Sequence, residues 1–265
     1  MTQRPRQVTR GIGDKVLWLF GLFLLLAPVA AIAQVAGEVL EVSQPAQLLS
    51  GGSSRTMSMG SAVSSGDVIK TGATGRVHLR FTDDTKIVVG PNSKLRLDET
   101  LFLANGTARK FATSALGGTF RFITGSSPKR VYKLSTPVAT MGIRGTVFDY
   151  TVVPGQRTDL LVFDGLVGLC SAGRNCVAVP GGCQAIAALS DGSFTQPLDA
   201  KAKRALLLRR FPLLADQTQI LPAFRVGNDG CQKVAILKLP AATERGENGG
   251  NQDGGNPPGG GNPAE

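Results

Sequence analysis

Residues 77–97 read VHLRFTDDTKIVVGPNSKLRL, and this stretch decides the fold class. Val77, Leu79 and Phe81 alternate with His78 and Arg80, which is the period-2 pattern of a strand with one buried face. A turn at Asp83-Asp84 is followed by a second alternating run that contains Ile87 and Val89. A turn at Gly90-Pro91-Asn92-Ser93 is followed by a third run that contains Leu95 and Leu97. The stretch therefore predicts short strands joined by tight turns, with His78 and Arg80 on the outward face and the paired carboxylates of Asp83 and Asp84 in solvent.

The same alternation runs outward from this stretch, beginning at Gly37, and helical periodicity is nearly absent before residue 195. The 34 glycines and 15 prolines among 265 residues supply many turns. Phe120 and Phe122 share one strand face, and Arg121 lies on the other. We expect an all-β fold of many short antiparallel strands in a sandwich, roll or solenoid, with one short C-terminal helix.

An ordered series of blocks resembles the FecR domain over roughly residues 35–192. The blocks read GDVIKTG (66–72), VHLRFTDDT (77–85), VGPNSKLRL (89–97), GTFRFITG (118–125) and TPVATMGIRGT (136–146). The resemblance implies an exported β-rich domain of the bacterial envelope. Founding members relay a signal from an outer-membrane transporter to a sigma-factor circuit, and they carry a cytoplasmic segment before a transmembrane helix. Here only 15 residues precede the first apolar run, so we expect a stand-alone secreted domain that is not itself a sigma-factor regulator.

The N-terminal residues 1–33 have the pattern of an export signal. Four basic residues precede the apolar run of residues 16–26, and Ala31-Ile32-Ala33 forms an A-x-A cleavage site before Gln34. We expect cleavage and a periplasmic or secreted product, with retention as an N-terminal anchor as the alternative. Removal of four basic residues and one acidic residue lowers the formal charge from +10 to +7.

Four cysteines fit an oxidising compartment. Four cysteines allow three pairings, and we favour Cys170–Cys176 with Cys183–Cys231. The first pair brackets a turn-forming segment, and the second closes a long loop to the C-terminal region. We expect no metal site, because the chain has one histidine and no C-x-x-C pair.

The FecR-like blocks also have a purely structural interpretation. Glycine and aspartate favour turns, proline favours a strand edge or kink, and a desolvated arginine needs a partner. We expect Arg144 to pair with Asp149 or Asp164, with recognition of an external anion as the alternative, and Arg121 has the same ambiguity. The structural assignment covers Gly66, Asp67, Thr71, Gly72, Arg121, Pro137, Gly142, Arg144 and Gly145.

An enzyme is not expected, and no cofactor is expected. A catalytic triad would need His78, and neither a G-x-S-x-G elbow nor a glycine-rich phosphate loop occurs. A facing carboxylate pair of the glycosidase type remains open at this stage.

The sequence divides the chain into an export signal (1–33), a FecR-like β domain (34–195), a C-terminal extension (196–240) and a disordered Gly/Pro-rich tail (241–265). Residues 198–210 predict a helix whose apolar face contains Leu198, Ala202, Ala205 and Leu206. Its basic residues are either a solvated face or a surface for anionic lipid, glycan or an acidic partner: Lys201, Lys203, Arg204, Arg209 and Arg210.

Two functions fit these features. The first is a non-catalytic binding or signalling module of the envelope, and the second is a structural protein that tethers anionic envelope polymer. The expected partner is therefore an envelope protein or a cell-wall polymer, with no nucleic acid and no membrane span after cleavage.

Overall fold

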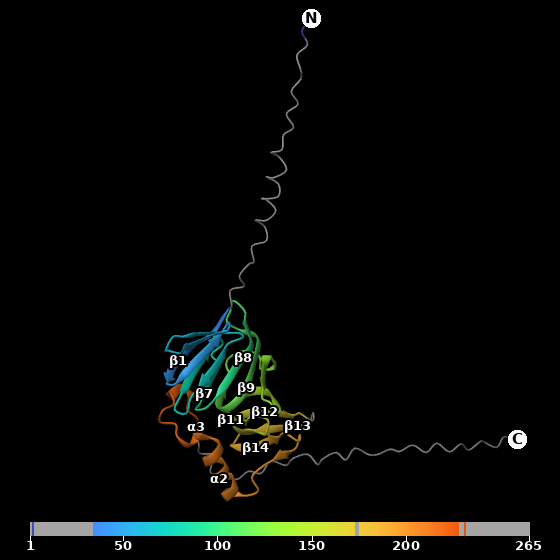
Figure 1. Cartoon of the computed structure of the whole chain (residues 1–265). Coiled ribbons are helices and arrows are strands. Elements are labelled where there is room, and N and C mark those ends of the chain that lie inside the picture. Colours follow the sequence, from blue (N-terminus) through green and yellow to red (C-terminus); the bar gives the residue numbers. More distant parts are fainter. Residues whose placement is uncertain (1, 3–33, 173–174, 228–230, 232–265) are drawn as a thin grey trace, which may run out of the picture.

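A computed structural model of the chain describes residue 2, residues 34–172, residues 175–227 and residue 231. The predicted export signal, apart from residue 2, and the tail at 241–265 lie outside the described residues. The all-β prediction is confirmed, since fifteen strands are joined in one sheet (Figure 1). The strands are β1 (Val35–Ser43), β2 (Ala46–Ser50), β3 (Ser53–Thr56), β4 (Ala62–Ser64), β5 (Val68–Thr71), β6 (Arg76–Phe81), β7 (Lys86–Val89), β8 (Lys94–Phe102), β9 (Ala108–Ile123), β10 (Tyr132–Ser135), β11 (Ala139–Val153), β12 (Arg157–Ser171), β13 (Cys176–Pro180), β14 (Gln184–Leu189) and β15 (Phe194–Thr195).

The main path of the sheet runs β15-β14-β12-β11-β10-β9-β7-β6-β1-β4, and β2, β3, β5, β8 and β13 branch from it. Its pairings are antiparallel except for β9 with β10, which are parallel. The long strand β9 pairs with β8 and β10 along its first part and with β7 and β11 along its second part. One strand thus belongs to several ladders, and the sheet folds over on itself around a shared interior.

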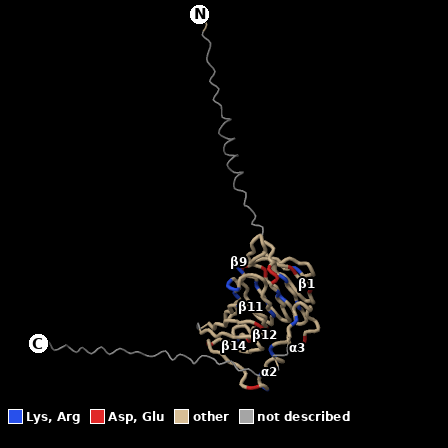
Figure 2. Tube along the Cα trace, turned by 180° about the vertical axis from the view of Figure 1, so that it is seen from behind, with Lys and Arg blue, Asp and Glu red and all other residues tan. Residues whose placement is uncertain are grey.

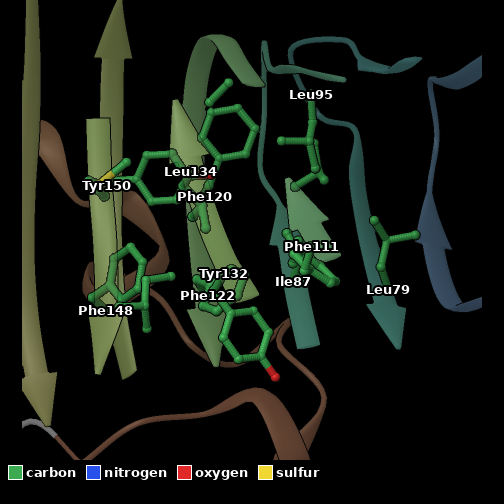
Figure 3. Close-up of a cluster of buried hydrophobic side chains, with 14 of the residues drawn as sticks. Leu79, Ile87, Leu95, Phe111, Phe120, Phe122, Tyr132, Leu134, Phe148 and Tyr150 are labelled. Atoms are coloured by element: carbon green, nitrogen blue, oxygen red, sulfur yellow. The ribbon is translucent and has the colours of Figure 1, made fainter. Parts of the chain in front are cut away.

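The interior is built from the residues that the alternation placed on one face. Phe111, Phe120, Phe122, Phe148 and Tyr150 are fully buried and lie side by side (Figure 3). The rings of Phe122 and Phe148 stack at 5.4 Å, and those of Phe120 and Tyr150 at 5.0 Å. Such ring pairs add specific geometry to the burial of apolar area, so adjacent strands are held in register.

The C-terminal region covers part of the outer face of the sheet. It contains α2 (Ala200–Arg210), α3 (Pro212–Ala215) and the 3₁₀ turn η2 (Pro222–Phe224), and a second 3₁₀ turn, η1 (Lys129–Val131), precedes β10. Both views place α2 and α3 along one side of the sheet (Figure 1, Figure 2). Leu213, Ile220 and Phe224 are buried against Val88 of β7. No helix in the described ranges is long and apolar enough to cross a membrane.

The predicted helix at 198–210 forms from residue 200, where the Asp199 carboxylate accepts a hydrogen bond from the Ala202 amide at 2.7 Å and caps the helix. Its predicted apolar face was wrong. Leu198 is 82% exposed, and Ala202 and Ala205 are also exposed, whereas Lys203 is buried. The reason is that Leu206 and Leu207 contact the small cluster around Phe211, which rotates the helix away from the expected seam.

Position 118, inside β9, requires glycine. Gly118 has φ 102°, and a Cβ there would lie 2.2 Å from Ser93 Oγ. We expect Gly118→Ala to lower the free energy of unfolding by about 3 kcal/mol, measured by urea denaturation, because the strained φ and the overlap add. Gly155→Ala is the control, since Gly155 has φ +67° but open surroundings and should lose about 1 kcal/mol. Equal losses in the two variants would contradict the role of the close contact with Ser93.

Candidate functional site

The first and third motif blocks, residues 66–72 and 89–97, form one hydrogen-bonded corner. The Thr71 hydroxyl donates to the Gly90 carbonyl at 2.6 Å and accepts from the Ser93 amide at 2.9 Å. The Asn92 amide donates to the Gly72 carbonyl, and a Cβ at Gly72 would lie 2.4 Å from Pro45 Cγ. These block residues are therefore occupied in holding the strands together and leave no group directed at a ligand.

Asp67 has the same kind of local task. Its carboxylate is buried and accepts a hydrogen bond from the Ser64 amide at 2.8 Å, next to Gly66 with φ 89°. The backbone of the same turn exchanges hydrogen bonds with Leu97 of β8. The Gly66-Asp67 pair thus builds the turn that brings β5 beside β8.

Arg121 and Asp149 form a completely buried ion pair between β9 and β11. Arg121 Nε and Nη2 donate to the two Asp149 oxygens at 2.7 and 2.8 Å. Arg121 Nη1 donates to Gln217 Oε1 at 2.7 Å and to the Phe224 carbonyl at 3.2 Å, and the guanidinium lies 5.4 Å from the ring centre of Phe163. Burial raises the pKa of Asp149, and the Arg121 charge opposes that shift. This cluster is sealed from solvent, so it serves the fold.

His78 lies under the C-terminal segment, and its predicted solvent-facing position was wrong. The side chain is 1% exposed, its ring is 5.0 Å from that of Phe224, and Nε2 accepts a hydrogen bond from the Leu221 amide at 3.4 Å. Burial and the charges of Arg76 and Arg121 lower the pKa of His78 to about 4. A neutral, covered imidazole with no nucleophile beside it does not form a triad.

Asp83 also departs from the expectation of a solvated pair. Asp84 is exposed and pairs with Lys86, but Asp83 is 2% exposed. Asp83 accepts hydrogen bonds from the Tyr132 hydroxyl at 2.6 Å and from the Thr85 amide at 3.0 Å. Burial and the bond to Asp83 raise the pKa of Tyr132 to about 12. The carboxylate thus fastens the β6–β7 turn to β10.

The last block lies differently. Pro137 is exposed in the short turn between β10 and β11. Within β11, Gly142 and Arg144 are exposed, and Gly145 (φ +65°) makes a bulge. The expected pairing of Arg144 with Asp149 was wrong, because Asp149 is used by Arg121, and within the described ranges Arg144 has no ion pair with Asp164 either. Among the described residues, Arg144 is exposed and forms no ion pair.

The basic residues of α2 do not form one surface. Lys201, Arg204 and Arg209 are exposed, whereas burial lowers the pKa of Lys203. Arg210 lies 3.8 Å from Asp159, and its carbonyl accepts a hydrogen bond from the Thr151 hydroxyl. Part of the predicted interaction set therefore belongs to the contact between helix and sheet.

The four cysteines form Cys170–Cys176 and Cys183–Cys231, which is the pairing that the sequence favours. The first bridge closes the β12–β13 hairpin, and the second brings residue 231 to β14. Within the described ranges, no group of three or more histidine, cysteine, aspartate or glutamate side chains could hold a metal ion.

A hollow of about 550 Å³ lies beside β1, β4 and β6. Its lining includes Glu38 and Arg80, which pair with each other at 2.6 Å, and Asp84, which pairs with Lys86. Because these charged groups neutralise one another, the hollow presents no free acid or base.

Comparisons with known proteins find one family model and two similar solved structures. Residues 67–168 match the family model described as FecR protein. Two crystal structures of a proposed anti-sigma factor from Parabacteroides distasonis ATCC 8503, at 1.65 and 2.50 Å resolution, are similar to this chain with 12% identity and TM-scores of 0.43 and 0.42. The matches cover 53% of this chain and only 64% and 63% of those chains, and likenesses at this level transfer no function. No curated protein sequence matches the chain.

We expect Arg121→Ala to lower the free energy of unfolding by about 3–5 kcal/mol, because it leaves the Asp149 carboxylate buried without its partner. The loss should shrink as the pH falls, since protonation of Asp149 removes the unpaired charge. Urea denaturation at pH 7 and pH 4 measures both effects. Arg144→Ala removes the same charge from the surface and should change stability by less than about 0.5 kcal/mol. A similar loss in both variants would refute the structural role of the buried pair.

His78 also predicts a pH dependence. Its folded-state pKa is depressed from 6.5 to about 4, so the unfolded state binds the proton first and stability falls as the pH drops from 6.5 towards 4. The shift corresponds to a loss of up to about 3 kcal/mol. Because His78 is the only histidine of the chain, His78→Asn should flatten the stability profile over this window in urea denaturation. A profile that keeps its slope in the variant would assign the dependence to other groups.

Proposed function

Residues 67–168 of this chain form a FecR domain, and on this premise we propose that the protein is an exported, non-catalytic binding or signalling module of the bacterial envelope. In this domain, one set of residues stabilises the fold and another set contacts the partner. The partner is an envelope component, either a protein or a cell-wall polymer.

The observation that supports this proposal most directly is that some motif residues are buried and others are exposed. Thr71, Asp67 and Arg121 are buried and satisfied by neighbours within the fold. Gly142 and Arg144, from the last block, lie on an open face of the sheet. A rigid scaffold with one exposed motif segment supports recognition of a partner better than it supports chemistry at a pocket.

A second candidate, a protein that tethers anionic envelope polymer, is supported by unpaired basic side chains. Lys129, Arg130, Lys133 and Arg144 are exposed and form no ion pair within the described ranges. The formal charge of +7 expected after cleavage at Ala33 would add long-range attraction to a polyanion.

The test is capture of the tagged whole chain from crosslinked cells, followed by identification of what co-purifies from the envelope. A stoichiometric envelope protein supports the signalling module, and cell-wall fragments that are released by salt support the tether. N-terminal sequencing of the captured protein should begin at Gln34 if export includes cleavage. Recovery of uncleaved protein from the cytoplasm without an envelope component would overturn the proposal.

A further inference from the structure

Two glycines face each other across β11 and β12 at positions where the fold does not need glycine. Gly142 pairs in register with Gly168. Neither has a positive φ. A Cβ at Gly142 would meet nothing within 4 Å, and one at Gly168 would meet only the Gly142 carbonyl at 3.8 Å. Glycine inside a strand weakens the strand, and it often marks a bulge, a bend, or a site where a ligand or another backbone approaches closely.

Neighbouring glycines show what a structural requirement looks like. Gly145 has φ +65° and makes the bulge of β11. Gly165 has φ +80°, and a Cβ there would lie 2.0 Å from the Gly145 carbonyl oxygen. Gly165 demands glycine for conformation and space and Gly145 demands it for conformation, whereas a Cβ at Gly142 or Gly168 would meet no close contact.

Basic side chains surround the open glycines. Lys133 of β10 is opposite Gly142 in the ladder, and Arg144 is two residues along β11 on the same outward face. Lys129 lies over the bulge, with its Nζ 2.8 Å from the position of a Cβ at Gly145, and Arg130 follows it. Figure 2 shows basic residues gathered at the side of the sheet near β9 and β11.

The charges of this cluster are available to a ligand. No side-chain hydrogen bond or ion pair occupies Lys129, Arg130, Lys133 or Arg144 in residues 34–172 and 175–227. Some basic residues elsewhere on the sheet are paired with acids, as in Arg80–Glu38, Arg96–Asp98 and Lys110–Glu99, whereas Lys70, Lys94 and Arg109 are exposed and have no ion pair within the described ranges. The nearest exposed carboxylate along the ladder is Asp164, which is opposite Val147 and beyond the bulge.

The face also lacks the anchors of a protein or membrane interface. The large apolar side chains that are exposed in the described ranges are Val35, Met59, Leu101, Leu103, Leu198 and Leu208, and none lies on β10 to β13. Protein interfaces centre on buried aromatic and apolar anchors, and membrane surfaces require apolar side chains to insert. Around the glycines lie Ser135 of β10, Thr140 of β11 and Ala178 of β13, together with half-buried Leu166 and the Cys170–Cys176 disulfide, on a surface roughly 14 Å wide across four strands.

We propose that the outer face of β10–β13 around Gly142 and Gly168 binds a carboxylated polysaccharide. The flat glycine strip lets sugar rings lie against the backbone, and Arg144, Lys133, Lys129 and Arg130 bind the carboxylates. Arg144 offers a planar fork that matches a carboxylate, and the lysines add point charges. The inference rests on the proposed binding function and names its surface and partner.

The test uses the whole chain, purified after export, and polygalacturonate as the probe, with neutral dextran as the blank. We expect binding by biolayer interferometry that weakens as salt rises. Arg144→Ala and Lys133→Ala should each weaken binding three- to tenfold. Lys94→Ala is the matched control, because Lys94 is an exposed lysine on β8 and the variant loses the same single positive charge.

The decisive variant is Gly142→Thr. Threonine favours strands and its side chain has free space here, so the melting temperature should stay equal or rise while binding falls at least tenfold. Gly142→Ala is the second variant, and we expect it to weaken binding less than Gly142→Thr does. A loss of binding without a loss of stability separates a contact surface from a structural defect.

Three results would overturn the inference. Unchanged binding by Gly142→Thr would show that the glycines do not contact the ligand. Equal losses of binding in Arg144→Ala and Lys94→Ala would show that binding depends only on the total charge. Tighter binding of polyglutamate than of polygalacturonate would assign the face to an acidic peptide. If the protein fails to bind polygalacturonate but crosslinking captures an envelope protein, the inference falls and the proposed function stands.

Discussion

The rest of the structure depends on the burial of the Arg121 guanidinium. Removing this cation from water is costly unless its donors find partners in a fixed arrangement. Asp149 meets it in register from the neighbouring strand, and Gln217 and the Phe224 carbonyl meet it from the C-terminal segment, about a hundred residues further along. The sheet and the C-terminal segment are therefore one folding unit. The residues that match the FecR family model are therefore stabilised in part by a segment that lies beyond the match.

That cover divides the outer face of β11 into two parts. At Asp149 and Thr151 the face is closed by the C-terminal segment, through Arg121 and through the bond from Thr151 to the Arg210 carbonyl. At Gly142 and Arg144, beyond the bulge at Gly145, the same face is open. One strand thus contributes to the stability of the domain at one end and presents an accessible surface at the other.

The sequence predicted the local strand pattern and the disulfide pairing, and it missed which outward strand faces the C-terminal segment covers. Alternation correctly placed Phe120 and Phe122 inside, since the period of a strand fixes which side chains share a face. It could not say which outward face another segment covers. His78 was expected in solvent and is buried by Leu221 and Phe224, which lie more than 140 residues away. Asp83 is bound by Tyr132 across a long separation, and Arg144 lost its expected partner to Arg121. A charged residue on an alternating strand gives the same sequence pattern whether its outward face is exposed to solvent or covered by another segment.

The family motif also contains residues of two kinds, and only the three-dimensional surroundings separate them. Thr71 and Gly118 are required by the fold, since their substitution would break bonds or create overlaps inside it. Gly142 meets no such requirement, because its surroundings accept a side chain freely. A glycine that weakens its own strand without such a requirement agrees with the proposed role of this face in binding. The buried motif residues therefore stabilise the domain, and the open face of β11 is the surface on which the proposed binding is to be tested.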